Sequence, residues 1–364
     1  MKRKFILLLF LVALLAICIY VLPCFVPFYD RYIFYPFQSL RIILFGWIPF
    51  SIGDIFYVLD GVMLLLTVVG WVSFIVKFST YKKRLAASVL NTINAVLFFC
   101  CFFVIGWGAN YSKPPLGEYW ELDTKVPEDK MERRKTDSLA LIAFDEFLVE
   151  KLNTCAMNYK VLSFNEVNER SKACYRMFTD SRVRRYGLGV KHSLFGYFLE
   201  RMAIDGYYNP FTGEGQVNGN TPAFMMPFII CHEMAHQAGI AAEGDANLMA
   251  YALGTTTTDV SFNYSAYLNI WLYTNNRLFR RDSVSAKQFE ARLNKLTTAH
   301  LDTLEQLSKK YNNEVSRYGT ELYDSYLKMQ NQKEGIRSYG NVSSSAWQLE
   351  LQRRSVGKRV INIP

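Results

Sequence analysis

The stretch CHEMAHQAGIAAEGDAN, residues 231–247, decides how the second half of this 364-residue chain is interpreted. It contains two histidines four positions apart, His232 and His236, with Glu233 directly after the first. On a helix, positions i and i+4 lie on the same face, so both imidazoles can reach one metal ion. The chain has only four histidines, and chance would produce this HExxH spacing on the order of 0.004 times in such a composition. The stretch therefore predicts a metal site on a helix.

Zinc suits this site, because imidazole and carboxylate ligands leave one coordination position open for water. A catalytic zinc ion usually has three protein ligands, so one more is needed beside the histidines. Glu243 is our choice, since Gly239 ends the first helix and lets the chain turn back; Asp245 is the competing ligand. Asn247 lies one helical turn beyond Glu243, where it can orient a histidine N–H. Glu233 is positioned as the general base that takes a proton from water and passes it to a leaving amine.

Three apolar stretches precede this motif and are predicted to cross a membrane. They cover residues 5–28, 55–76 and 85–108, and each has about the 20 residues needed to span the hydrocarbon core. The first follows basic residues 2–4 and is too long for the roughly 7–15-residue apolar core of a signal peptide, so we expect an uncleaved anchor. Residues 31–53 are rich in aromatics and broken by prolines, which suits an interfacial or re-entrant stretch.

The charge distribution sets the expected topology. Of the net charge of +9, residues 1–84 contribute +6, from nine basic and three acidic residues. Basic residues beside apolar segments indicate a lipid bilayer, not nucleic acid, as the partner. The basic residues at 2–4 and 77–84 belong on the cytoplasmic side. We therefore expect residues 1–109 to form a multi-pass domain in a bacterial cytoplasmic (inner) membrane, and residues 110–364 to form an extracytoplasmic domain.

The extracytoplasmic domain is predicted to be mostly helical. DGYYNPFTGEGQVNGN, residues 205–220, has aromatic, Thr and Val residues between turn residues and predicts a short β-ribbon. Helices are expected over about 243–253, ended by Gly254, and over 261–279. From Phe289 to Tyr311, mostly apolar residues recur at spacings of three and four, which predicts one long helix. The expected fold class is mainly α, with transmembrane helices followed by a helical zinc-hydrolase domain that carries a short β-ribbon.

Two resemblances extend this interpretation. The tail formed by Glu243, Asp245 and Asn247 resembles the ExEA[DN] signature of gluzincin-type peptidases, in which the first glutamate is a ligand and the final residue supports the site. Four stretches resemble a family of bacterial membrane-anchored proteins that are interpreted as zinc metallopeptidases and are otherwise of unknown function. These stretches are WGANYSKPPL (107–116), GYYNPFTGEGQVN (206–218), the 231–247 motif and KMQNQKEGIRSYG (328–340).

This family resemblance covers nearly the whole chain and implies three N-terminal spans before a gluzincin-like HExxH domain. Gly244 interrupts the run of acidic residues that the family usually has here, but Glu243 is retained. The resemblance also makes Tyr207, Glu214 and Asn218 candidates for a substrate cleft, where a strand pairs with extended peptide backbone. A polar turn explains these residues equally well. Tyr339 is a candidate oxyanion donor.

The sequence therefore predicts a membrane-bound zinc metallopeptidase that hydrolyses peptide or protein substrates. One alternative is a non-catalytic membrane sensor or scaffold that binds peptides or cell-wall fragments. A zinc amidase acting on a non-peptide amide shares the same site and is the other alternative. Metal content, measured together with turnover of a peptide library, distinguishes the sensor from the peptidase.

Overall fold

The computed structural model describes residues 2–122, 130–178, 187–311 and 342–355. The chain forms two compact units. The N-terminal unit comprises Met1–Lys113 and the loop Asn209–Glu214, and the C-terminal unit comprises Pro114–Tyr208 and Gly215–Pro364. The described residues are mainly helical with one small three-stranded sheet, which confirms the coarse fold class.

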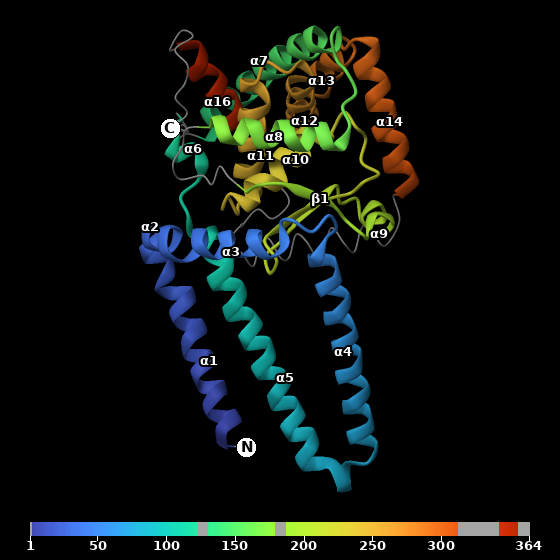
Figure 1. Cartoon of the computed structure of the whole chain (residues 1–364). Helices are drawn as coiled ribbons and strands as arrows, with labels where there is room; N and C mark the ends of the chain where they lie inside the picture. Colours follow the sequence, from blue (N-terminus) through green and yellow to red (C-terminus); the bar gives the residue numbers. More distant parts are fainter. Residues whose placement is uncertain (1, 123–129, 179–186, 312–341, 356–364) are drawn as a thin grey trace. The chain divides into compact units, whose positions relative to one another are not determined.

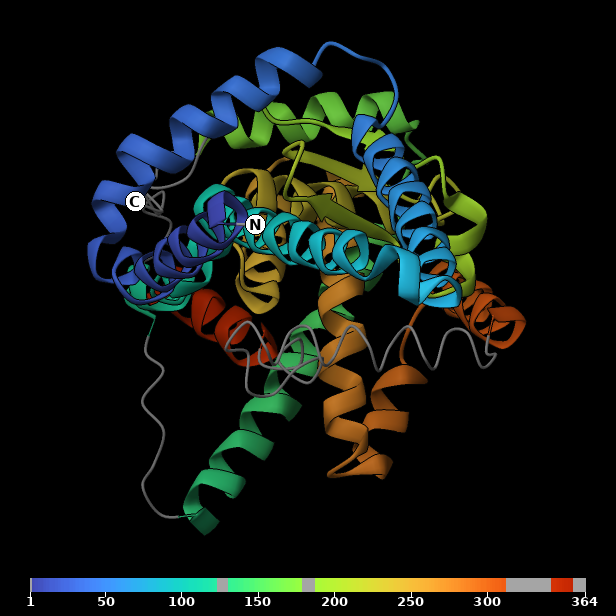
Figure 2. The same cartoon turned by 90° about the horizontal axis from the view of Figure 1, so that it is seen from below.

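Three helices of the N-terminal unit are long and apolar enough to cross a membrane: α1 (Lys2–Tyr20), α4 (Ile52–Val76) and α5 (Phe78–Gly106). Both α1 and α4 pack against α5 (Figures 1 and 2). The first helix ends at Tyr20, not at residue 28 as predicted, because Pro23 and Pro27 each fall at the start of a new short helix. The third begins at Phe78 instead of residue 85, since the basic residues that precede the apolar run continue the helix.

The predicted interfacial stretch between the first two apolar helices is itself helical. Residues 31–53 contain most of η2 (Asp30–Phe34) and all of α3 (Tyr35–Phe45), which follow η1 (Leu22–Phe25) and α2 (Val26–Tyr29). After α5 the chain forms η3 (Gly108–Ser112). Lys113, which follows η3, is the last residue of the stretch Met1–Lys113 in this unit. Lys113 makes a 2.7 Å ion pair with Asp30, and Phe34, next to Trp107, is fully buried. These short elements thus have a small aromatic core of their own.

The C-terminal unit is a helical assembly with the small sheet at its side. Among the described residues, its helices are α6 (Leu116–Tyr119), α7 (Lys130–Ala156), α8 (Phe164–Met177), α9 (Gly196–Arg201), α10 (Met226–Gln237), α11 (Glu243–Thr256), α12 (Val260–Phe279), α13 (Ser283–Glu290), α14 (Lys295–Tyr311) and α16 (Val342–Ser355). Helix α12 packs against α7, α10, α11, α13 and α16, so the core of this unit surrounds it (Figure 1).

The predicted ribbon is present as β2 (Gly206–Asn209) and β3 (Glu214–Val217). A third strand, β1 (Val190–His192), pairs in parallel with β3, with Val190 opposite Gly215, and the sheet order is β1-β3-β2. No strand was predicted at 190–192. Three residues are too few to show the alternation by which a strand is recognised in sequence.

Gly254 was expected to end a helix, but α11 continues through it to Thr256. A Cβ atom at Gly254 would lie 2.7 Å from the Cβ atom of Ala266 on α12. The glycine is therefore required because α11 and α12 approach each other closely, and this contact could not be inferred from local sequence.

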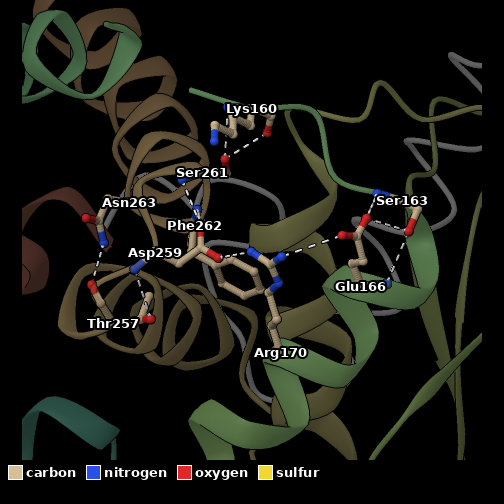
Figure 3. A network of polar contacts seen from close by, with 9 residues as sticks. All are labelled: Lys160, Ser163, Glu166, Arg170, Thr257, Asp259, Ser261, Phe262 and Asn263. Carbon is tan, nitrogen blue, oxygen red and sulfur yellow. Dashed lines mark hydrogen bonds and ion pairs between the residues drawn. The ribbon is translucent and has the colours of Figure 1, made fainter. Parts of the chain in front are cut away.

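A polar network joins the starts of α8 and α12 (Figure 3). Ser163 and Glu166 form a reciprocal capping box at the start of α8. Asp259 caps α12 by accepting the Ser261 N–H at 2.9 Å. Arg170 forms ion pairs with both Glu166 and Asp259, so one guanidinium connects the two capped ends.

The predicted single helix from Phe289 to Tyr311 is wrong, because two helices, α13 and α14, are separated by a turn at 291–294. Asn294 caps α14 by accepting the Thr297 N–H at 3.0 Å. Asn153 on α7 holds the turn, donating to the Arg292 carbonyl and accepting the Asn294 N–H. The apolar residues keep their helical spacing across the turn, so the turn could not be recognised from this spacing. Asn153, which stabilises the turn, is distant in sequence.

We predict that Asp145 makes stability depend on pH. It is fully buried on α7 and accepts hydrogen bonds from Trp271 at 2.7 Å and Asn275 at 3.1 Å. Burial outweighs these bonds and raises the pKa of Asp145 from 3.8 to about 7. The folded protein thus keeps the proton that the unfolded chain loses above about pH 4, so stability falls from pH 4 to 7 and then levels off. Relative to the wild type, the unfolding temperature of Asp145→Asn should therefore increase by at least about 2 °C between pH 4 and pH 7.

Scanning calorimetry or intrinsic fluorescence in detergent measures these midpoints. Glu146→Gln, on the exposed side of the same helix, is the control for replacing a carboxyl group of α7 by an amide. A pH-independent difference for Asp145→Asn would mean that this carboxyl group is ionised in the folded protein throughout the range.

Candidate metal centre

The turn between α10 and α11 brings the two halves of the sequence motif together. Pro227 lies in the first turn of α10, and Gly239 follows its end with φ of 95°, in the left-handed region. The Ile240 N–H donates to the Ala235 carbonyl and the Gly239 N–H to the His236 carbonyl, both at 3.0 Å. This pair of bonds is a Schellman motif, which reverses the chain so that α11 can begin at residue 243.

The side chains of His232, His236 and Glu243 converge on one point. Their candidate ligand atoms all lie within 4.8 Å of one another, so this cluster could hold a metal ion. Glu243 Oε2 is 3.1 Å from His232 Nε2 and 3.5 Å from His236 Nε2, and the two Nε2 atoms are 3.2 Å apart. His236 Nδ1 lies 2.8 Å from the Ile240 carbonyl, to which it can donate, leaving Nε2 for a metal. The helix-ending turn therefore also orients one of the candidate ligands.

The charges in this cluster favour a shared cation. Burial opposes a charge on His236, but the carboxylates of Glu243 and Glu233 outweigh it and raise the pKa of His236 to about 9. Burial and the neighbouring His236 lower the pKa of His232, against the effect of Glu243. Although burial raises the pKa of Glu243, the two histidines hold it well below the ordinary value. At neutral pH His236 thus carries a second ring proton and a positive charge, and a metal ion would displace this proton.

The Glu233 carboxylate lies beside this cluster and against the sheet. It is 3% exposed, and Oε2 has no hydrogen-bond partner among the described residues. A Cβ atom at Gly206 would lie 2.6 Å from Glu233 Oε1, and one at Gly215 would lie 3.3 Å from Glu233 Cβ. Burial raises the pKa of Glu233 to about 8. Gly206 and Gly215 therefore leave room for the buried Glu233 carboxylate, of which Oε2 has no hydrogen-bond partner among the described residues.

Asn247 on α11 interacts with the candidate ligand His232. It is 1% exposed, and its side chain forms hydrogen bonds that affect the pKa values of both His232 and Tyr273. Among the described residues, neither His232 Nδ1 nor Asn247 Nδ2 has a hydrogen-bond partner of normal geometry, although both atoms are buried.

Asp245, the competing third ligand, is directed elsewhere. Its carboxylate accepts a hydrogen bond from the Leu116 backbone, and burial raises its pKa to about 6. The structure therefore brings Glu243, and not Asp245, to the two histidines.

The candidate cleft residues have other contacts. The Glu214 carboxylate accepts the Gly53 N–H at 2.7 Å, at the start of α4. Asn218 is 3% exposed, and its side chain accepts the Asn220 N–H while its backbone N–H donates to the Asp205 carbonyl. The Tyr207 hydroxyl is 3.1 Å from the Ser193 hydroxyl. We interpret Glu214 as a helix cap and Asn218 as a turn residue, which agrees with the polar-turn alternative.

The other two histidines, His192 and His300, pack against aromatic side chains. His300 stacks on Phe224 with ring centroids 4.0 Å apart, and its Nδ1 is 2.8 Å from the Tyr264 hydroxyl. His192 packs on Phe164 with centroids 3.9 Å apart. Tyr339 and the stretch 328–340 lie outside the described residues.

Two residues near the site were missed from the sequence. Tyr273 on α12 is half-buried, and burial together with the charges of Asp205 and Glu243 raises the pKa of its hydroxyl. The charge of Asp205, directly before β2, contributes to the raised pKa of Glu233. Neither belongs to a motif, and only folding brings α12 and the start of β2 to the cluster.

Metal binding should distinguish the two acidic candidates. We predict that Glu243→Gln weakens zinc binding by at least about 100-fold, because a neutral amide replaces a carboxylate ligand, whereas Asp245→Asn changes it by less than about threefold. Competition with a chromophoric chelator measures both affinities. Equal losses for the two variants, or a larger loss for Asp245→Asn, would assign the third ligand differently.

Comparisons with known proteins agree with the extent of the sequence resemblance. The family model "Protein of unknown function (DUF3810)" matches residues 29–344. No curated protein and no solved structure matches the chain. Since the family match covers well over half of its length, the chain belongs to the family DUF3810.

Proposed function

We propose that this chain is a membrane-bound metallopeptidase with a gluzincin-like zinc site. The observation that carries the proposal is the convergence of His232, His236 and Glu243 beside the buried carboxylate of Glu233. Two imidazoles and one carboxylate form a donor set that suits zinc and leaves a coordination position open. The unpartnered Oε2 of Glu233 fits the same conclusion, because a buried acceptor needs a donor such as water.

A zinc ion held there would acidify a water molecule and polarise a substrate carbonyl. Glu233 would accept the proton from that water and deliver it to the leaving amine. The Ile240 carbonyl and Asn247 would hold the two imidazoles in the orientations that the metal requires. Tyr273, with its hydroxyl protonated at neutral pH, is the candidate donor to the oxygen that becomes negative in the transition state.

The apolar helices and the basic residues around them support a location in the bacterial cytoplasmic membrane. We propose that residues 1–109 are the membrane domain and that residues 110–364 carry the site on the extracytoplasmic face. Peptides or proteins outside the cytoplasm would then be the substrates.

The general base gives the sharpest test of the proposed activity. Glu233→Gln should lower turnover of a peptide library by about 10²–10⁴-fold, because a neutral amide cannot accept the proton, while zinc content stays stoichiometric. Mass spectrometry of the products and elemental analysis of the detergent-solubilised protein measure the two quantities. Glu146→Gln is a matched control on the exposed surface and should keep wild-type turnover.

Undiminished turnover in Glu233→Gln would refute the mechanism. A wild-type protein that contains zinc but cleaves no peptide, including cell-wall peptides, would favour the sensor. Turnover restricted to non-peptide amides would favour the amidase.

Topology is tested separately. A reporter fusion at Tyr111 should be active only when the reporter works outside the cytoplasm, because three spans place this residue opposite the basic residues 2–4. Alkaline phosphatase and a cytoplasmic fluorescent protein fused at this site provide opposite readouts. A cytoplasmic location for Tyr111 would reverse the proposed orientation.

A further inference from the structure

The β2–β3 hairpin is shared between the two units of the chain. Its loop, Asn209–Glu214, belongs to the N-terminal unit, whereas Gly206–Tyr208 and Gly215–Val217 belong to the C-terminal unit. The hairpin thus combines a loop held by one set of neighbours with strands held by another.

At the loop end, Glu214 caps a helix of the N-terminal unit. It is 4% exposed, and its Oε2 accepts the Gly53 N–H at 2.7 Å and the Thr212 hydroxyl at 2.9 Å. Its Oε1 accepts the Ile52 N–H at 3.4 Å. These N–H groups lie in the first turn of α4, where no intrahelical acceptor exists and a negative charge is favourable.

Two buried side chains of α3 bind the carbonyl groups of the same loop. Gln38 is fully buried and donates to the Gly213 carbonyl at 2.9 Å. Arg41 is 2% exposed and donates to the Pro210 carbonyl, to the Gly106 carbonyl at 3.2 Å and to Gln38 Oε1. Removing a guanidinium from water costs free energy that only good hydrogen bonds offset. A buried arginine bound to a loop carbonyl is therefore strong evidence that this loop is held in one place.

The loop is also held by its aromatic residue and by its backbone conformation. Phe211 stacks on Phe102 of α5 with ring centroids 5.9 Å apart. Gly213 has φ of 71°, and a Cβ atom there would lie 2.7 Å from Gln38 Oε1. Only glycine fits this close approach in the left-handed region without strain.

At the strand end, the hairpin contacts the proposed general base. Gly206 and Gly215 are the residues whose missing side chains leave room for Glu233, as described above. Gly206 is three residues from the loop, about 10 Å along an extended strand. A shift of the loop is therefore transmitted over a short, hydrogen-bonded strand to the backbone that confines the Glu233 carboxylate.

We propose that Arg41, together with Gln38, is a positioning residue for Glu233. By holding the loop Asn209–Glu214, these side chains fix the ends of the two strands that confine the carboxylate. The catalytic consequence rests on the proposed peptidase function, but the positioning itself does not.

The test compares Arg41→Met with Arg31→Met in the full-length protein in nanodiscs. Arg31 lies in the adjacent helical segment but is exposed, with its guanidinium 5.5 Å from the Tyr32 ring. Hydrogen exchange should become at least tenfold faster at the amides of residues 206–208 and 215–217 in Arg41→Met and stay unchanged in Arg31→Met. Peptide turnover should show kcat lowered about tenfold, with KM and zinc content at wild-type values, because the ligands and the substrate surface are intact.

Gln38→Leu is the second variant, since it removes the bonds of Gln38 to Gly213 and Arg41 but leaves the guanidinium with its bonds to the Pro210 and Gly106 carbonyls. It should give the same pattern with a smaller increase in exchange, and it decides the question if Arg41→Met also loosens helices α1, α4 and α5. Unchanged hairpin exchange in Gln38→Leu and in a folded Arg41→Met would overturn the proposal. Faster hairpin exchange in a protein whose wild type cleaves no peptide would support the positioning role and refute the peptidase function.

Discussion

The geometry of the candidate site depends on the turn that ends α10. Gly239 adopts a left-handed conformation, the two reverse hydrogen bonds of the Schellman motif form around it, and the chain returns to start α11 at Glu243. The same turn presents the Ile240 carbonyl to His236 Nδ1. One backbone reversal therefore delivers the third ligand candidate and orients the second. A residue with a Cβ atom at position 239 would strain this turn, and the strain would affect the positions of both Glu243 and His236.

The parts of the site that could be predicted are those that lie within a few turns of one another. Helical periodicity alone places His232, Glu233 and His236, and the glycine after the helix explains how Glu243 can return. Tyr273 could not be predicted in this way, because α12 reaches the cluster only through its packing in the core. The contacts of Glu214 could not be predicted for the same reason, since its partners at the start of α4 lie about 160 residues away in sequence.

Glycine shows most clearly why local patterns give ambiguous predictions. Gly239 and Gly254 both follow apolar helical residues, and both were expected to end helices. Gly239 does so with a positive φ, whereas Gly254 lies inside α11 and makes room for Ala266 on α12. Gly206 and Gly215, predicted only as ribbon residues, make room for Glu233. These glycines are needed where another residue approaches the backbone closely, and that residue is usually distant in sequence.

The electrostatics of the cluster connect metal binding to the proposed chemistry. Burial raises the pKa of Glu233 to about 8 even though the charge of His236 lowers it, so without a metal ion Glu233 is mostly protonated at neutral pH and cannot act as a base. A divalent charge among His232, His236 and Glu243 would favour the ionised form of Glu233 and displace the proton from His236. The site would then become basic only when it is loaded with metal. Burial beside the candidate ligands destabilises the charged form of Glu233. In this interpretation, Glu233 can act as a general base only when the metal is bound.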